Sequence, residues 1–256
     1  MAIIRKCAIV STLILCSSTA FADSTTLTGT VRDFTPAHPD FESGIGGWQP
    51  GLVGTTLTGS APTLVSTGSD IDSAASFAQW WGPAAPSTSH SITLAETAPG
   101  SGIYSYSNLA FFPIDGMLLG DYGGTGHNYH FTFQIAATFG YTPGAGQVFT
   151  FGGDDDVWVY FDKKLGIDLG GVHGFESRTV NLDTLFGPGK AAGNYAFDFF
   201  FAERHTSGSN LTISTSLNLV AAPVPEPETY AMLLAGLGLL GMAARRRKQK
   251  GVAAVD

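Results

Sequence analysis

The sequence predicts an all-β fold, a single antiparallel β-sandwich or barrel, because its apolar residues alternate with small polar ones. From Leu211 to Leu219 the apolar residues fall largely on odd positions, which is the period of a half-buried antiparallel strand. Aromatic residues alternate in the same way in 195–201 and in 129–135, so each set shares one face of a strand. The nearly continuous apolar run 157–161 is typical of a strand buried on both faces.

Glycine and proline clusters separate these segments, for example at 123–126, 143–146 and 187–189. Short strands with such breaks indicate a sandwich or barrel, and the absence of a fixed repeat disfavours a solenoid or propeller. The 44% of hydrophobic residues among 256 excludes a disordered chain. One short helix is expected at 70–81, with Asp70 or Asp72 near its N-cap.

The N-terminal segment 1–22 has the pattern of a secretory signal peptide. Arg5 and Lys6 supply its positive charge, an apolar stretch follows, and the small residues of 20–22 form a cleavage site. A lipoprotein cleaved before Cys16 is the alternative, but the residue before this cysteine is a bulky leucine, which fits that motif poorly. The sequence therefore predicts ordinary export of the chain.

The C-terminal segment 223–250 joins a Pro-Glu-Pro motif to an apolar run at 230–244 and an arginine cluster, and a tail at 251–256 follows. The motif and cluster residues are Pro225, Glu226, Pro227, Arg245, Arg246 and Arg247. Fifteen helical residues span about 22 Å, which is short for a hydrocarbon core of about 30 Å, although the arginines can snorkel. We expect a short transmembrane helix that holds the protein in the inner membrane transiently, with a permanent anchor as the alternative.

This order of motifs resembles the PEP-CTERM sorting signal. The resemblance implies that an exosortase-type processing protease of the membrane cuts near the Pro-Glu-Pro motif and passes the protein to the cell surface or extracellular matrix. The predicted mature part is then a single β domain at 23–222.

The predicted domain 23–222 contains six basic and eighteen acidic residues, a net charge of −12. This charge argues against nucleic acid as a partner, and it suits divalent cations or plain solubility. Both cysteines of the chain, Cys7 and Cys16, lie in the signal peptide, so disulfides cannot stabilise the domain.

Three consecutive carboxylates, Asp154, Asp155 and Asp156, directly precede the apolar run 157–161. Like charges this close raise one another's pKa unless a cation or hydrogen-bond donors neutralise them. A turn at the preceding glycines would let the carboxylates converge on one ion, and hard oxygen ligands favour Ca²⁺. An exposed acidic turn that only solubilises the strand is the alternative, since the spacing is not that of an EF-hand.

Longer segments around this triplet resemble the fibro-slime domain family, in the order that the family has them. They are 31–34, 38–41, 111–116, 127–132, 154–158, 167–173 and 201–210. That family is similar to the protective-antigen-type β-barrel modules of toxins, glycosidases and yeast adhesins. The resemblance spans most of residues 28–218.

The resemblance implies a calcium-assisted carbohydrate site. In the adhesins, two successive aspartates joined by a cis peptide hold Ca²⁺, which binds vicinal sugar hydroxyls, and the matching pair here is Asp154 and Asp155. Glu203 or Asn210, in the last loop, would complete the metal shell together with backbone carbonyls, while Asp156 is a candidate ligand from the triplet itself. A structural ion pair of Glu203 with its neighbour Arg204 is the alternative.

Three further residues are candidates for contacts with the sugar. His173 and His205 follow Gly-rich or loop segments, although a loop histidine bonded to backbone is the more ordinary outcome. Trp80 could offer its ring to a pyranose.

The sequence lacks the motifs of common hydrolases, so we expect that the protein is not an enzyme. It has no Gly-x-Ser-x-Gly elbow and no His-Glu-x-x-His helix. The predicted function is calcium-assisted binding of carbohydrate, and the expected ligands are the exopolysaccharides of a biofilm matrix. A structural matrix protein or adhesin, whose aspartate cluster only stabilises the fold, is the alternative.

Overall fold

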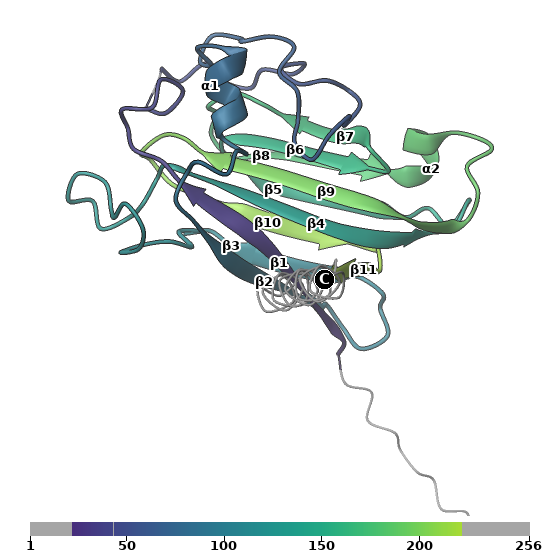
Figure 1. The fold of residues 1–256 in the computed structure, drawn as a ribbon. Coiled ribbons are helices and arrows are strands. Elements are labelled where there is room, and N and C mark those ends of the chain that lie inside the picture. Colours follow the sequence, from purple (N-terminus) through teal and green to yellow (C-terminus); the bar gives the residue numbers. More distant parts are fainter. Residues whose placement is uncertain (1–21, 43, 222–256) are drawn as a thin grey trace, which may run out of the picture. The chain divides into compact units, whose positions relative to one another are not determined.

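Antiparallel strands make up most of the structure, a computed structural model that describes residues 22–42 and 44–221. The strands are β1 (Ser24–Asp33), β2 (Ser87–Glu96), β3 (Tyr104–Asn108), β4 (Phe131–Tyr141), β5 (Val148–Gly153), β6 (Asp156–Phe161), β7 (Lys164–Leu169), β8 (Glu176–Asn181), β9 (Gly193–Glu203), β10 (Leu211–Thr215) and β11 (Leu219–Ala221). The helices are α1 (Ala74–Gln79) and α2 (Leu182–Phe186). Figure 1 shows their arrangement.

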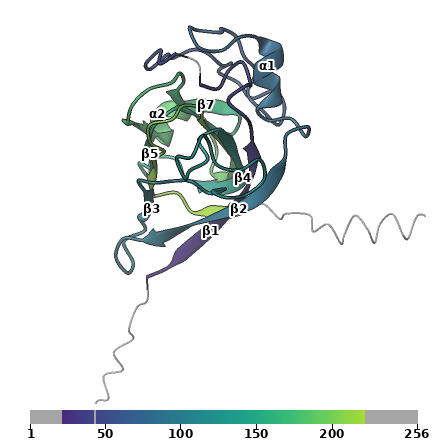
Figure 2. The same cartoon turned by 90° about the vertical axis from the view of Figure 1, so that its left-hand side faces the viewer.

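The strands form one sheet in the order β7-β6-β9-β4-β1-β2-β3-β10-β5-β8, and β11 pairs with β4. The two end strands, β7 and β8, contact each other, so the sheet curls into a nearly closed barrel around its core (Figure 2). Trp48 bridges them: its Nε1 donates to the Asp168 carbonyl of β7 at 3.2 Å, and the Arg178 guanidinium of β8 lies 4.4 Å from its ring centroid. The predicted all-β sandwich or barrel is confirmed.

Alternation along the strands sorts the apolar side chains into two cores. The inward residues of β6 and β9, among them Val157, Val159 and Phe199, pack inside the barrel. The outward residues Trp158 and Phe200 pack against a second cluster on the outer face of the same strands. The prediction that 157–161 is buried on both faces is confirmed, and it follows that this part of the sheet lies between two layers.

The outer layer is built from the long connection between β1 and β2, which includes α1. The helix is shorter than predicted, and its N-cap is Ser73 rather than Asp70 or Asp72, because the Ser73 hydroxyl accepts from the Ser76 backbone N–H at 3.1 Å. Asp70 is buried and serves another contact, described below.

The predicted strand 211–219 is two strands in the structure. After Thr215 the chain leaves its partners β3 and β5, and β11 then pairs with β4. The break occurs at Ser216, whose hydroxyl accepts from the Val148 N–H at 2.9 Å. The predicted strand 129–135 also begins later in the structure: β4 starts at Phe131, so Tyr129 lies before the strand.

The predicted targeting segments lie almost wholly outside the described residues. This holds for the signal peptide 1–22, apart from its last residue, and for the sorting signal 223–250 with its apolar run 230–244. Among the residues that the structure does describe, no helix combines the length and apolar character needed to cross a membrane.

Gly29 of β1 tests how tightly the barrel wall is packed. A Cβ at this position would lie 2.3 Å from the Gln134 carbonyl oxygen and 2.7 Å from the Phe133 ring. We expect Gly29→Ala to lower the free energy of unfolding by about 2 kcal/mol, measured by urea denaturation, because backbone must move. Gly59→Ala is the control, since nothing lies within 4 Å of its Cβ position; equal losses in both variants would contradict the assigned packing.

Candidate functional site

The connection between β5 and β6 carries the aspartate triplet, at one end of the barrel. β5 ends at Gly153 and β6 begins at Asp156. Asp155 has a φ of 51°, in the left-handed region, so the chain turns sharply between the two strands. No peptide bond among the described residues is cis, so the expected cis bond between Asp154 and Asp155 is not found. The turn sends the three carboxylates to different surroundings.

The carboxylate of Asp156 is fully buried and pairs with the guanidinium of Arg204. Its Oδ2 accepts from Arg204 Nε, and its Oδ1 accepts from the Gly171 N–H at 2.6 Å. Both side chains have no exposed surface. Asp156 is therefore held by protein donors, which corrects its prediction as a metal ligand.

Arg204 extends this contact to the outer layer. Its Nη1 donates to the carbonyl oxygens of Asp40 and Asp70 at 2.9 Å each, and its Nη2 lies 3.4 Å from Asp70 Oδ1. The predicted alternative, an ion pair with the neighbouring Glu203, is replaced by these partners. Arg204 thus ties the end of β9 to two segments of the connection between β1 and β2.

The other two carboxylates, those of Asp154 and Asp155, line a cavity of about 340 Å³. Its walls come from the β7–β8 connection at 172–175, the β9–β10 connection at 205–208, and Ile45. Asn210 donates to Asp154 through both its backbone N–H and its side-chain amide. Asp155 Oδ2 accepts from the Arg204 N–H at 2.6 Å. The structure therefore brings this predicted pair together in one cavity.

Three acidic side chains, those of Asp154, Asp155 and Glu203, are close together at the cavity. Burial raises the pKa of Asp155 to about 7, with a further contribution from the charge of Asp156. Burial also raises the pKa of Asp154. The pKa of the fully buried Glu203 is held well above its usual range by burial and by the charges of Asp155 and Asp154. Three neighbouring carboxyls thus favour their neutral forms, as expected where opposing positive charge is insufficient.

This set of oxygen donors suits a hard cation only in part. Carboxylates are the ligands that Ca²⁺ prefers, and Asp154 and Asp155 both face the cavity. Glu203 and Asn210 contact or approach this pair but do not line the cavity. Within residues 22–42 and 44–221, no group of three or more histidine, cysteine, aspartate or glutamate side chains is arranged to hold a metal ion. The predicted five-residue shell is thus reduced to two acids.

The predicted sugar-contacting residues have different surroundings. His173 is buried at the cavity wall, and its ring nitrogens lie 2.7 Å from the Gly174 carbonyl oxygen and 3.3 Å from that of Leu169. It therefore holds the β7–β8 connection. His205 also lines the cavity and is partly exposed, so it remains available for a ligand.

The prediction that Trp80 stacks on a sugar is wrong, because its side chain is 0% exposed. Its Nε1 donates to Asp40 Oδ2 at 2.8 Å, and its ring lies under the Arg204 guanidinium, 4.9 Å from centroid to Cζ.

Glu42 is a residue of the site that sequence reasoning missed. Its Oε1 accepts from the Thr206 N–H at 3.0 Å and lies 3.0 Å from His130 Nε2. Its Oε2 lies 3.7 Å from His205 Nε2. Glu42 therefore positions the β9–β10 connection from 164 residues away in the chain, and no local pattern in the sequence could signal this contact.

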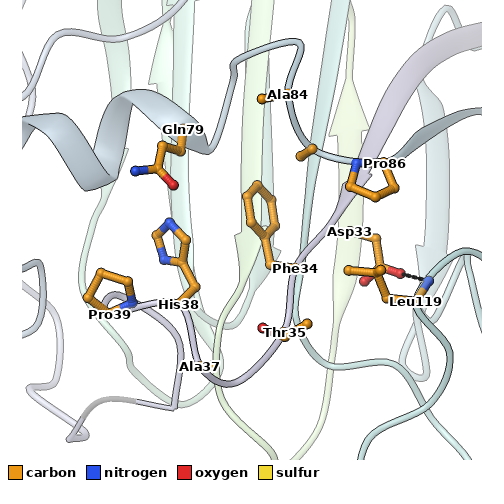
Figure 3. Close-up of a pocket in the computed structure, with 11 residues that line it drawn as sticks. Asp33, Phe34, Thr35, Ala37, His38, Pro39, Gln79, Ala84, Pro86 and Leu119 are labelled. Atoms are coloured by element: carbon orange, nitrogen blue, oxygen red, sulfur yellow. Dashed lines mark hydrogen bonds between the residues drawn. The ribbon is translucent and has the colours of Figure 1, made fainter.

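A second hollow, of about 490 Å³, lies between the end of β1, the end of α1 and the segment before β2 (Figure 3). Its walls are mostly apolar, with Phe34, Pro39, Pro86 and Leu119 among them. The one carboxylate there, Asp33, accepts from the Leu119 N–H at 2.7 Å and from Asn128 Nδ2 at 2.8 Å. This hollow offers no unneutralised pair of acids, so the cavity at Asp154 and Asp155 is the stronger candidate.

Comparison with known sequence families supports two of the predicted resemblances. Residues 120–227 match the PA14 domain, which is the protective-antigen-type module, and residues 223–248 match the PEP-CTERM protein-sorting motif. Both resemblances are confirmed, and the sorting motif indicates export to the cell surface or extracellular space. The narrower resemblance to the fibro-slime family stays a prediction.

Curated relatives extend the similarity over most of the chain. Protein psiQ of Dictyostelium discoideum is 40% identical over 214 residues, 75% of this chain and 21% of psiQ. Protein psiC of the same organism is 38% identical over 230 residues, 81% of this chain and 43% of psiC. The chain thus spans less than half the length of these relatives. A solved GH31 alpha-xylosidase from Xanthomonas citri covers 52% of the chain at 10% identity and a TM-score of 0.24, too low to support an argument.

Replacing Arg204 tests its structural role. Arg204→Met would leave Asp156 as an unpaired buried charge, so we expect the free energy of unfolding to fall by about 3 to 5 kcal/mol in urea denaturation. The matched control is Glu176→Gln, at a half-exposed pair with Arg178, where a loss within about 1 kcal/mol is expected. A small loss at Arg204 would refute its role as the buried link.

The raised pKa of Asp155 predicts that the free energy of unfolding depends on pH when a chelator keeps the protein free of metal. The folded state holds this proton up to about pH 7, whereas the unfolded state releases it near the ordinary value of about 3.9, so stability is lost as pH rises between these values. Asp155→Asn imitates the neutral acid. We expect this variant to gain roughly 2 kcal/mol relative to the native protein between pH 5 and pH 8.

Thermal or urea unfolding at a series of pH values would measure this difference. Asp72→Asn, at an exposed carboxylate, should run parallel to the native protein. A native-minus-variant difference that stays constant with pH would contradict the burial of Asp155 as an acid.

Proposed function

We propose that this protein is an exported carbohydrate-binding module whose site is the cavity at Asp154 and Asp155, and that Ca²⁺ assists binding there. The observation that carries the proposal is the pair of under-neutralised carboxylates that line a preformed cavity. PA14 domains often bind carbohydrate, and the matched region 120–227 contains both aspartates and both cavity loops.

The cavity dimensions and chemistry support a small polar ligand. A volume of about 340 Å³ lies at the lower end of the range for small-molecule sites, which suits one sugar unit rather than a larger cofactor. Asp154 and Asp155 would hold the cation, which would neutralise them and offer coordination positions to vicinal hydroxyls. His205, which is partly exposed at the cavity wall, would donate a hydrogen bond to the sugar or accept one from it.

The sorting motif supports an activity outside the cell. The chain would pass through the inner membrane as an intermediate, be processed by an exosortase-type protease at Pro225 to Pro227, and reach the surface or extracellular matrix. Exopolysaccharide is the proposed partner there. We propose a binding role rather than an enzymatic one, because the sequence has neither the Gly-x-Ser-x-Gly nor the His-Glu-x-x-His motif of common hydrolases.

A structural matrix protein is the second candidate, and one observation favours it. Asp156, a member of the same triplet, already serves the fold through Arg204. If Asp154 and Asp155 also served only the fold, bound Ca²⁺ would raise stability and no sugar would bind.

Calcium titration tests the proposed site. In calorimetry with the full-length chain, we expect Ca²⁺ to bind, and Asp155→Asn to weaken this binding at least tenfold, because one of two acidic ligands is neutralised. Excess Ca²⁺ should also raise the melting temperature of the native protein, since it binds only the folded state. Asp72→Asn is the control and should bind Ca²⁺ as the native protein does.

The same titration separates the two candidates when a panel of sugars is added. Sugar binding that disappears in chelator supports the proposed function. Calcium binding without any sugar binding supports the structural candidate, and no heat with an unchanged melting temperature would exclude the metal.

A further inference from the structure

An exposed aromatic ring stands at the rim of the aspartate cavity. Phe175 lines the cavity and is 55% exposed. By contrast, eleven of the twelve largest fully buried side chains in the described residues are aromatic. Ile45, 65% exposed, lines the same opening from the connection between β1 and β2. The cavity therefore combines an acidic floor with an apolar rim.

The segment that carries Phe175 is firmly held. The Gly171 N–H donates to Asp156 Oδ1 at 2.6 Å, and the Val172 N–H donates to Asp70 Oδ2 at 2.9 Å. The buried ring of His173 contacts two carbonyl oxygens of the same segment. Because its base is fixed by these bonds, Phe175 is presented in a defined place before any ligand arrives.

Gly152 of β5 leaves space for the ring. An ideal Cβ at Gly152 would lie 2.7 Å from Phe175 Cζ and 3.4 Å from Cε2, so the ring edge lies against the strand where a side chain is absent. The ring is thus supported by the sheet while most of its surface stays open to solvent.

We infer that Phe175 is the stacking residue of the site and that it selects pyranoses whose vicinal diol lies beside an apolar C–H face. The diol edge turns toward Asp154 and Asp155, and the C–H face lies on the ring. This inference rests on the proposed function and adds a determinant of which sugars bind. It also replaces Trp80, which is buried, as the aromatic partner.

Calorimetry with the full-length chain in excess Ca²⁺, using the methyl pyranosides of glucose, galactose and mannose as probes, tests the inference. We expect Phe175→Ala to weaken binding of the preferred pyranoside about tenfold and to leave Ca²⁺ affinity unchanged. Phe175→Trp should keep the affinity, whereas Phe175→Leu, which retains apolar surface without a π face, should lose it.

Val220→Ala is the matched control, because Val220 is similarly exposed but lies far from the cavity. Val220 is on β11, next to Leu219, whose carbonyl oxygen accepts a hydrogen bond from the Thr25 hydroxyl. Thr25 lies at the end of β1 opposite to the end near the cavity. If Phe175→Ala bound the preferred pyranoside with the affinity of the native protein, the inference would be overturned and the proposed function would stand. Calcium binding without binding of any pyranoside would overturn the inference and the sugar half of the proposed function, and absence of both would overturn the whole proposal.

Discussion

The buried guanidinium of Arg204 is the contact on which the arrangement of the site depends. It is the charged link between the end of β9, the start of β6 at Asp156, and the outer layer at Asp40 and Asp70. An ion pair without solvent is costly to desolvate, so its geometry must be closely complementary. The backbone N–H of the same residue bonds Asp155, and the link therefore sets the position of the cavity floor as well.

The aspartate triplet divides into a structural part and a part that lines the cavity because the chain turns at Asp155. With a left-handed φ at that residue, Asp156 points into the buried network while Asp154 and Asp155 reach the cavity. The structural and functional explanations of the triplet therefore apply to different residues. Under-neutralised acids lower the stability of the apo fold, and such local destabilisation is common at ligand sites.

The sequence predicts the fold well where its signal is local. Period-two alternation in β4, β6 and β9 depends only on neighbouring residues, and so does the buried run 157–161. That Asp154 and Asp155 line one cavity depends on the left-handed turn at Asp155, in addition to their adjacency. In contrast, the partner of Arg204 could not be found, because Asp156 and Asp70 lie 48 and 134 residues away along the chain. The prediction that Trp80 is available to a ligand was wrong for the same reason, since its burial depends on the outer layer.

The walls of the cavity come from three separate connections, and each is fixed by contacts outside the cavity. Glu42 holds the β9–β10 connection, His173 and Asp70 hold the β7–β8 connection, and the Gly47 N–H donates to the Val172 carbonyl beside Ile45. Little backbone entropy is left for a ligand to remove, which favours affinity from a small contact area. Because Glu42 and Asp70 do not line the cavity, a substitution of Ile45 or Phe175 at its wall would leave these two anchors in place.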